Sequence, residues 1–555
     1  MSGFRIGRFT GFVRTLCVIA PGVTLLAACE RVDTHDTETI RELTSTEEMD
    51  STVRAFYAER DYRPAWTTAG GLTNGGEKLV EALALAARDG LDPEMYGVAD
   101  AESAFSAGDS SLAAEREQRL AVADIALTSG YLALLRDLRL GLYDPDDVQP
   151  DWDIEQKRDE EAAASLTISE EDPKDAVAAA RPSWKEYQRL SALYEELQGM
   201  QRRGRLPKVP ETRDLRPGTR SHDVAALRAR LLASEYPLER TEASRGLADN
   251  SFFDSGLARA LRSFQERHGL NPQRVPDRAT MAALNTSLDD RIASVRLNLE
   301  RWRWMPNEPG ERALLVNIAG YDLQALANDS VVLTMRTIVG EPEWRTPVFS
   351  DTVTYIVAHP YWNVPESILT EELLPRVMEN DTYLVSNDYE VLDTDGNVID
   401  GSDVDWSELD PDSLPYRIRQ RPGDGNALGA LKFMFPNQDN VYLHDTPEKY
   451  LFSGHKRAFS HGCVRVQRPF ELAEMLLEWT GVREESLDEA IDAGADNERI
   501  ELGSGVSVYL AYFTVRVDED GRPRFLPDIY DLDRQMQSRL EATVRPQRVA
   551  RMASR

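Results

Sequence analysis

Three features of the sequence predict a multidomain α+β protein. The chain has 555 residues, which is too many for one hydrophobic core and indicates several domains. Its composition, 41% hydrophobic and 29% charged, is that of an ordinary folded protein. Helical periodicity dominates up to residue 304, and short β-type runs separated by turn residues follow from residue 313. We therefore expect helical domains first and a mainly-β domain after them.

Residues 1–28 are typical of an export signal. Arg5, Arg8 and Arg14 precede an apolar stretch, 16–26, that is too short to span a bilayer. The segment that ends at Cys29 resembles a bacterial lipobox, in which this cysteine becomes the lipidated first residue. A plain cleavage site and an uncleaved anchor are the alternatives. Residues 29–48 are polar and are predicted to be a tether, so we expect a periplasmic, lipid-anchored protein.

Residues 49–214 are predicted to form a helical scaffold domain. Amphipathic patterns cover 77–88, 112–139 and 184–203, and each is followed by a glycine within two residues. Reactive residue types are not concentrated anywhere in this region. A structural role is therefore the simplest interpretation.

Residues 215–287 are predicted to be a compact helical unit, followed by a connecting helix within 288–310. The unit resembles the small three-helix peptidoglycan-binding module. A helical packing unit without its own ligand is the alternative. The segments that carry the resemblance are 224–228, 260–265 and 280–285.

Residues 311–482 are predicted to be the mainly-β domain. Its β-type runs are interrupted at about 366–425 by helical and charged sequence. An insertion of that length beside a candidate site is typical of a lid. The remaining segment, 483–555, contains one more β run at 506–517 and an Arg-rich end that we expect to be disordered.

Cys463 is the only cysteine beyond the first thirty residues. A lone thiol can be a buried and inert side chain. Here Gly462 precedes it and allows the backbone to approach a reacting carbonyl, while His461 and His444 lie two and nineteen residues upstream. Because the thiolate is the reactive form, a nearby imidazole is what a nucleophilic cysteine needs. The pattern therefore predicts cysteine-based catalysis.

The charge balance limits the partners. The chain has 64 basic and 95 acidic residues and a net charge of -31, which argues against nucleic acid and against a general anionic membrane surface. A zinc site formed by His444, Asp445, His455 and His461 is a rival interpretation. The sequence has no His-Glu-x-x-His or Cys-x-x-Cys pair, so we expect no metal and no other cofactor.

The residues around the thiol resemble the active-site signature of the L,D-transpeptidases. His444 follows a predicted strand, and Ser-His-Gly-Cys-Val-Arg begins at Ser460; segments 360–365 and 426–433 match other blocks of this family. The helical N-terminus and the inserted module resemble its long Gram-negative subclass. Cys463 is then the nucleophile and His444 the general base and acid. Supporting roles fall to His461, Gly462, Asp445, Ser460 and Arg465, and substrate-binding roles to Trp362, Asn363, Tyr442 and Phe459.

Position suggests what the supporting residues do. Asp445, through its carboxylate or its backbone carbonyl, would fix the tautomer of His444. The backbone N–H groups of Gly462 and Cys463 would be oxyanion donors. His461 would orient the loop or assist the thiolate, with a purely structural role as its alternative. Arg465 would be a structural contact or a contact to a substrate carboxylate.

The resemblance implies acyl transfer between peptidoglycan stem peptides. Cys463 would attack the third residue of a tetrapeptide donor, D-alanine would leave, and the diaminopimelate amine of an acceptor stem would open the thioester to give a 3→3 cross-link. A protein lysine as acceptor stays open. A carboxypeptidase or endopeptidase of the same fold and a non-catalytic wall-binding lipoprotein are the alternative functions.

Overall fold

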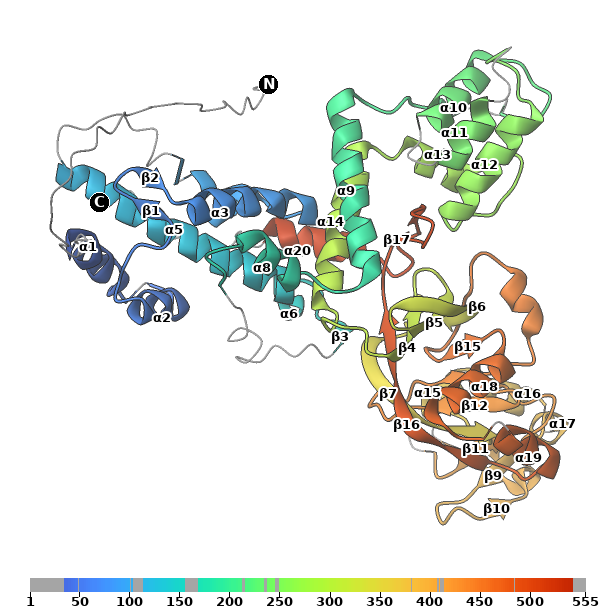
Figure 1. Cartoon of the computed structure of the whole chain (residues 1–555). Coiled ribbons are helices and arrows are strands. Elements are labelled where there is room, and N and C mark those ends of the chain that lie inside the picture. Colours follow the sequence, from blue (N-terminus) through green and yellow to red (C-terminus); the bar gives the residue numbers. More distant parts are fainter. Residues whose placement is uncertain are drawn as a thin grey trace, which may run out of the picture.

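The structure is a computed structural model that describes residues 34–47, 49–99, 101–102, 113–154, 168–211, 215–233, 237–244, 249–380, 382–406, 409, 414–483 and 485–542. The predicted export signal, with Cys29, lies outside these residues, as does the Arg-rich end. Within the described ranges, no helix is long and apolar enough to cross a membrane. Figure 1 shows a helical scaffold on one side, a small helical module, and a catalytic domain built around a β-sheet.

The scaffold is organised around one long helix, α5 (Ala113–Leu140), which runs along its length in Figure 1. Helices α3 (Asn74–Ala84) and α8 (Pro173–Ala180) share a buried apolar cluster with it. The predicted helices at 77–88 and 112–139 are thus confirmed, the first ending in a 3₁₀ turn.

The predicted tether is wrong where the structure describes it. Residues Thr34–Thr44 form a helix, α1, and Ile40 is fully buried in a cluster that also contains Ile125 of α5. A segment this polar shows almost no apolar periodicity in its sequence. Contacts between α1 and α5 order it instead, and Leu43 packs against the same cluster as Ile40.

Two helices connect the scaffold to the catalytic domain. Helices α9 (Lys185–Arg203) and α14 (Leu288–Trp304) lie side by side (Figure 1). The sequence predicts a helix in each of these segments but not their contact. The rings of Trp184, the residue before α9, and Trp302 of α14 pack in a tilted arrangement with centroids 5.1 Å apart. Both rings belong to the same apolar core as the catalytic sheet, so α14 is a structural element of that domain as well as a connection.

Among the described residues of the module, the structure shows a fourth helix in addition to the predicted three. Helices α10 (His222–Leu232), α12 (Ser255–Arg267) and α13 (Arg278–Asn285) confirm the prediction, and each begins after a side chain that accepts a hydrogen bond from the backbone N–H three residues on. The additional helix, α11 (Pro237–Ser244), is polar in sequence and gives no amphipathic signal.

The module is docked against a hairpin that follows the catalytic sheet in the sequence. This hairpin pairs β17 (Val515–Val517) with β18 (Pro523–Phe525). Phe525 packs against the module core, His268 stacks on its ring at 6.1 Å, and the guanidinium of Arg291 lies 4.9 Å from the ring centroid. The module therefore has a defined position relative to the catalytic domain.

The catalytic sheet has ten strands whose pairing closes on itself. The order is β12-β13-β15-β6-β5-β4-β16-β7-β3, β12 also pairs with β7, and β14 pairs with β6. The strands are β3 (Trp152–Asp153), β4 (Arg312–Asn317), β5 (Asp322–Ala327), β6 (Ser330–Gly340), β7 (Val348–Ala358), β12 (Leu431–Met434), β13 (Leu443–His444), β14 (Ala458–Ser460), β15 (Val464–Val466) and β16 (Glu498–Ala511). The fold is thus the multidomain α+β arrangement that the sequence predicts.

Residues 483–542 contribute more structure to the catalytic domain than the predicted β segment. Strand β16 lies between β4 and β7, inside the sheet. Two helices, α19 (Glu485–Ala493) and α20 (Leu532–Ala542), also belong to this segment. Helix α20 packs beside the scaffold (Figure 1). It has few apolar residues, so its sequence gives a weak helical pattern.

The insertion predicted as a lid forms a small unit with its own core. A four-stranded sheet joins β8 (Trp362–Asn363), β9 (Tyr389–Leu392), β10 (Val398–Ile399) and β11 (Arg417–Gln420). A helical run covers Glu366–Ile368, a π-helical turn at Leu369–Leu373 and α16 (Leu374–Glu379). Leu373, Val377 and Trp406 belong to its core.

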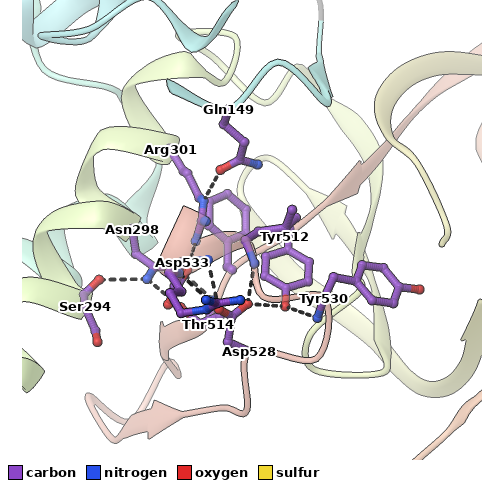
Figure 2. Close-up of polar contacts among 12 residues, drawn as sticks. Gln149, Ser294, Asn298, Arg301, Tyr512, Thr514, Asp528, Tyr530 and Asp533 are labelled. Carbon is purple, nitrogen blue, oxygen red and sulfur yellow. Dashed lines mark hydrogen bonds and ion pairs between the residues drawn. The ribbon is translucent and has the colours of Figure 1, made fainter. Parts of the chain in front are cut away.

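A buried polar network ties the C-terminal segment to the other parts (Figure 2). Arg301 of α14 donates to Gln149 of the scaffold at 2.8 Å and pairs with Asp533. Thr514 donates to Asp533 at 2.6 Å and accepts from Asn298 of α14 at 2.9 Å. The hydrogen bonds cross from scaffold to α14 to the end of the catalytic sheet, so the segment after β16 is fixed in place.

Candidate active site

Three neighbouring strands place a row of polar side chains on one face of the catalytic sheet. Strand β13 lies between β12 and β15, and the register pairs His444 with Lys432 on one side and with Arg465 on the other. Paired residues point to the same face, and residues two apart along a strand return to it. Tyr442 and Cys463 therefore join this row, as the bond from the Val464 N–H to the Tyr442 carbonyl (3.1 Å) indicates.

Cys463 is a free, partly exposed thiol. Burial raises its pKa, and hydrogen bonds from the backbone and hydroxyl of Tyr442 and the charges of Lys432 and Arg465 partly oppose that effect. Its Sγ lies 3.7 Å from the carbonyl oxygen of Asn440. The sulfur is thus protonated at neutral pH, and the Tyr442 donors and the two cations offset only part of the effect of burial.

The loop before the thiol is held by a few hydrogen bonds. Gly462 has a φ of 111°, which side chains of L-residues avoid. Ser460 Oγ donates to the Cys463 carbonyl at 2.5 Å and accepts from the Gly462 N–H at 3.3 Å. The Gly462 N–H is therefore engaged, whereas the Cys463 N–H has no partner among the described residues. The predicted pair of oxyanion donors narrows to the Cys463 N–H in this conformation.

A second layer supports the same loop from a distant part of the sequence. Thr346 Oγ1 donates to the Gly462 carbonyl at 2.7 Å. The Thr346 N–H donates to the Tyr530 hydroxyl at 3.1 Å, and that hydroxyl donates to the Gly340 carbonyl at 2.6 Å. The C-terminal segment shown in Figure 2 thus reaches the thiol loop through Tyr530.

His444 is almost fully buried, with 3% of its surface exposed. Burial, followed by the charge of Arg465, lowers its pKa to about 3, so the imidazole is neutral at physiological pH. Its ring lies edge-on to that of Tyr442, with centroids 5.6 Å apart. No hydrogen bond joins it to Cys463 Sγ in the described structure, because the register puts Tyr442, not His444, opposite the thiol.

The Asp445 carboxylate does not orient His444. It accepts hydrogen bonds from the N–H groups of Ala430 (3.0 Å) and Thr446 (2.7 Å) and pairs with Lys449. Adjacent strand residues point to opposite faces, which explains why this carboxylate turns away from the imidazole. The backbone of Asp445 does hydrogen-bond the histidine and raises its pKa, so only that half of the predicted role has a contact.

The two other predicted supporting residues bind acids. His461 Nε2 lies 2.6 Å from Glu372 Oε1 in the π-helical turn of the insertion, and its ring lies 5.3 Å from that of Trp344. Arg465 Nη1 lies 2.6 Å from Glu448 Oε2. His461 therefore connects the thiol loop to the insertion, and Arg465 supplies positive charge beside both Cys463 and His444.

Protein-family models match three parts of the chain. The L,D-transpeptidase catalytic domain matches residues 311–483, a "Putative peptidoglycan binding domain" matches 220–284, and a scaffold domain matches 51–193. Residues 311–483 therefore form an L,D-transpeptidase catalytic domain. A "Putative L,D-transpeptidase" of Haemophilus influenzae is 37% identical over 255 residues, which are 45% of this chain and 50% of that protein. The chain thus spans about half the length of this curated relative.

Solved L,D-transpeptidases are distant. L,D-transpeptidase 1 of Mycobacterium tuberculosis is 12% identical, with 37% of this chain and 63% of that chain covered and a TM-score of 0.14. An enzyme of the same name from Xylanimonas cellulosilytica is 14% identical, with 54% and 98% covered and a TM-score of 0.14. Scores this low support no conclusion about structural detail.

In this catalytic domain, the predicted groove residues separate into two groups. The Trp362 indole hydrogen-bonds the Tyr442 hydroxyl and lies 6.3 Å from the Tyr389 ring, so it does face the thiol row. Asn363 follows it on β8, is exposed, and points to the other face. Phe459 is 37% exposed on β14, between buried neighbours.

Lys432 is a member of the L,D-transpeptidase site that sequence reasoning missed. Its Nζ lies 3.8 Å from the centroid of the Tyr442 ring, and burial lowers its pKa while the charge of Cys463 raises it. The alternation of buried Leu431 and Phe433 around it indicated a strand with Lys432 on the opposite face. Only the pairing of β12 with β13 shows which residues share that face.

The remaining histidines of the sequence cluster lie elsewhere. His359 Nε2 contacts the Ile491 carbonyl at 3.2 Å, and His455 lines a cleft that includes neither Cys463 nor His444. Among the residues that the structure describes, no group of three or more His, Cys, Asp or Glu side chains could hold a metal ion.

Proposed function

We propose that this protein forms 3→3 cross-links in peptidoglycan through a thioester on Cys463. The observation that carries the proposal is the partly exposed thiol in a row with Tyr442, Lys432 and a neutral His444. Its peptidoglycan-binding and catalytic domains act on peptidoglycan, which suggests a cell-wall or periplasmic location. The tetrapeptide donor, the diaminopimelate acceptor and the identities of the catalytic residues are parts of the proposal.

The proposed first step is acylation. Cys463 Sγ attacks the carbonyl carbon of the third stem residue while its proton moves to His444. The Cys463 N–H and the nearby cations stabilise the negative charge that develops on the oxygen and sulfur. The C–N bond to D-alanine then breaks, and the imidazolium returns the proton to the leaving amine. A protonated His444 is a strong acid here because burial and Arg465 lower its pKa.

The second step is transfer. The side-chain amine of an acceptor stem attacks the thioester carbonyl and gives a proton to His444. The C–S bond then breaks, and His444 passes that proton to the departing sulfur, which regenerates the Cys463 thiol. Water competes with this amine, and its attack would instead give a shortened monomer. The insertion at 366–425, which contacts the thiol loop through His461 and Glu372, is the element that we propose to exclude water.

The test is mass spectrometry of muropeptides after pure protein acts on sacculi. We expect 3→3 dimers from the unmodified chain and none from Cys463→Ala, with an unchanged circular dichroism spectrum for the variant. A carbapenem-type acylator should add one adduct at Cys463. Shortened monomers without dimers would identify a hydrolase, and dimers formed by Cys463→Ala would remove the thioester from the mechanism.

We also propose that Cys29 is lipidated after signal cleavage. The support is the lipobox-like segment, which lies outside the described residues. The mass of the mature N-terminal peptide decides the matter, with Cys29→Ser as the comparison. An unmodified mature terminus in the native chain would leave a soluble exported protein.

A further inference from the structure

A large cleft separates the module from the catalytic sheet. Its volume is about 810 Å³, and its walls come from helix α12 of the module, strands β5 and β6, the loop before β14 and the end of β18. Module docking through Phe525 holds the two walls together, and Gly269 at the end of α12 approaches Pro527 closely. The cleft is thus part of the assembled chain and distinct from the thiol row.

The cleft is strongly basic in a protein whose net charge is -31. Two acids line it, and each is paired: Asp322 lies 3.3 Å from Arg524, and Glu266 lies 3.3 Å from Arg262. More cations than acids therefore face the cavity. The cationic side chains are Arg262, Arg336, Arg457, Arg468 and Arg524, and His455 also lines the cleft.

Two of these arginines have no carboxylate within ion-pair distance in the described part of the chain. Arg457 is 9% exposed and donates to the carbonyl oxygens of Thr337 (3.1 Å), Gly454 (2.7 Å) and Tyr321 (2.8 Å). Arg336 is exposed and donates to the Phe452 carbonyl at 2.8 Å. Neutral carbonyls accept from their N–H groups, and the charge of Asp322, which already pairs with Arg524, opposes that of Arg457 only from beyond ion-pair distance.

The electrostatics agree with a missing anion. Burial, and then the charge of Arg336, lowers the pKa of Arg457 to about 10. Burial, followed by Arg457 and Arg336, also lowers the pKa of His455. The two arginines therefore repel each other in the free protein and disfavour protonation of His455, and an anion bound among these side chains would remove that repulsion.

The cleft opens on the same face of the sheet as the thiol row. Strand register pairs Arg336 with Asp322, and Ile338, two residues further on β6, with Arg465. The turn Lys449–Ser453 contacts both sites: Glu448 before it pairs with Arg465, and the Phe452 carbonyl accepts a hydrogen bond from Arg336. A ligand in the cleft would thus lie on the side from which Cys463 is approached.

We propose that this cleft binds the carboxylates of a peptidoglycan peptide stem and holds it between the module and the catalytic domain, outside the acylation site. The proposal rests on the proposed function, because it takes the wall polymer as the substrate. A carboxylate-bearing stem suits the site, since arginines bind carboxylates in bidentate pairs and the cavity is large enough for several residues. Arg336 is the accessible anchor, and buried Arg457 reinforces the field.

The test measures binding without turnover, by calorimetry on the full chain carrying Cys463→Ala. The probes are a soluble disaccharide tetrapeptide and the same fragment with its carboxylates amidated. We expect Arg336→Glu to weaken binding of the free acid at least tenfold, and Arg336→Lys to restore most of it. Amidation should weaken binding to the parent more than binding to Arg336→Glu. Arg483→Glu, at an exposed side chain far from the cleft in sequence, is the matched control.

Two results would overturn the proposal: equal affinity of the parent and Arg336→Glu, or an equal amidation penalty in both. Folding is checked in the single variant Arg336→Glu, which keeps Cys463. If this variant is folded, a carbapenem-type probe should acylate it at the rate of the unmodified protein. Failure of the proposed function appears differently, as absent acylation in the unmodified chain. The binding comparison uses a protein without the thiol and remains decisive in that case.

Discussion

Tyr442 contacts both side chains to which we assign the chemistry. Its hydroxyl bonds the Cys463 sulfur and accepts from the Trp362 indole, and its ring packs against His444 and under Lys432. The Tyr442 phenol therefore lies between the neutral thiol and the neutral imidazole and contacts both. Burial raises the pKa of this phenol well above its normal value. The phenol keeps its proton throughout the physiological range and acts as a fixed donor.

We expect Tyr442→Phe to raise the pKa of Cys463, because a donor to the thiolate is lost. A hydrogen bond to a charged group contributes about 1.5–3 kcal/mol, so acylation at neutral pH should fall about tenfold to a hundredfold. The rate-versus-pH curve should move to higher pH, and neither protein should show a break near pH 6.5. The variant Tyr450→Phe, at a side chain 70% exposed, is the control. Superimposable profiles for the parent and Tyr442→Phe would contradict this.

The two histidines should differ in their effect on acylation. His444→Ala removes the proposed base and should slow acylation by about 10²–10⁴-fold. His461→Ala removes a contact to Glu372, so its effect on acylation should be smaller and should change the fate of the thioester instead. Stopped-flow acylation of both variants across pH makes the comparison. If His461→Ala were acylated more slowly than His444→Ala, His461 and not His444 would be the general base.

At the scale of elements, the insertion and the C-terminal segment both end on the thiol loop. The insertion reaches it through the π-helical turn that contains Glu372, and the C-terminal segment through Tyr530. Both contacts cross long separations in sequence. They provide two independent ways to perturb the loop without touching the thiol.

Glu372→Gln should loosen the insertion. Its carboxylate binds His461 Nε2 at 2.6 Å, and the amide would leave a weaker contact. We expect faster hydrogen exchange over residues 366–379 and a larger share of hydrolysed monomer relative to dimer. Glu371→Gln changes the neighbouring exposed carboxylate and should behave as the parent. If both variants gave the same ratio of monomer to dimer, the contact between Glu372 and His461 would not contribute to water exclusion.

Tyr530→Phe should slow acylation while the rest of the fold stays intact. The Gly340 carbonyl would lose its donor and the Thr346 N–H its acceptor, at a cost of about 1–3 kcal/mol in unfolding free energy. Tyr57→Phe, which breaks buried hydrogen bonds to Asp124 and Thr128 in the scaffold, is the matched control. Both should lower the melting temperature, and only Tyr530→Phe should lower kcat. Equal kcat values would make Tyr530 a purely stabilising residue.

The elements themselves were predictable where periodicity is strong. The helices around α5, α9 and α12 and the strands β4 to β7 follow from apolar spacing in the sequence. Helices α1, α11 and α20 were missed because their apolar residues are few and their order comes from contacts with distant parts. Strand register is likewise invisible in the sequence. For that reason the thiol loop was recognisable, whereas its neighbours Lys432, Glu372 and Tyr530 were not.

At the scale of the whole molecule, buried neutral histidines link stability to pH. His268 lies between the module and Phe525, and burial lowers its pKa to about 3. An unfolded histidine takes up a proton near pH 6.5, so the folded state is favoured above that pH and loses stability as the pH falls toward 3. His444 adds to the same dependence.

We expect this linkage to be measurable at the module interface. Each such histidine costs about 2 kcal/mol of stability between pH 7 and pH 5. His268→Asn keeps a donor for the Phe264 carbonyl, which now lies 2.8 Å from Nδ1, but cannot titrate. Its loss of melting temperature between the two pH values should be smaller than that of the parent and of the exposed control His222→Asn. An identical loss in all three would show that His268 does not report on module docking.

Strand β16 has a consequence for how the chain acquires its shape. It lies inside the ring of strands, yet it follows every other strand of that sheet in the sequence. A polypeptide that emerges from a ribosome or a translocation pore presents β4 to β15 first, and these cannot close before residue 511 appears. Contacts so distant in sequence form slowly. The sheet of the nascent chain therefore stays open, and the loop of Cys463 lacks its support from Tyr530. We expect the thiol to become reactive only when nearly the whole chain has emerged.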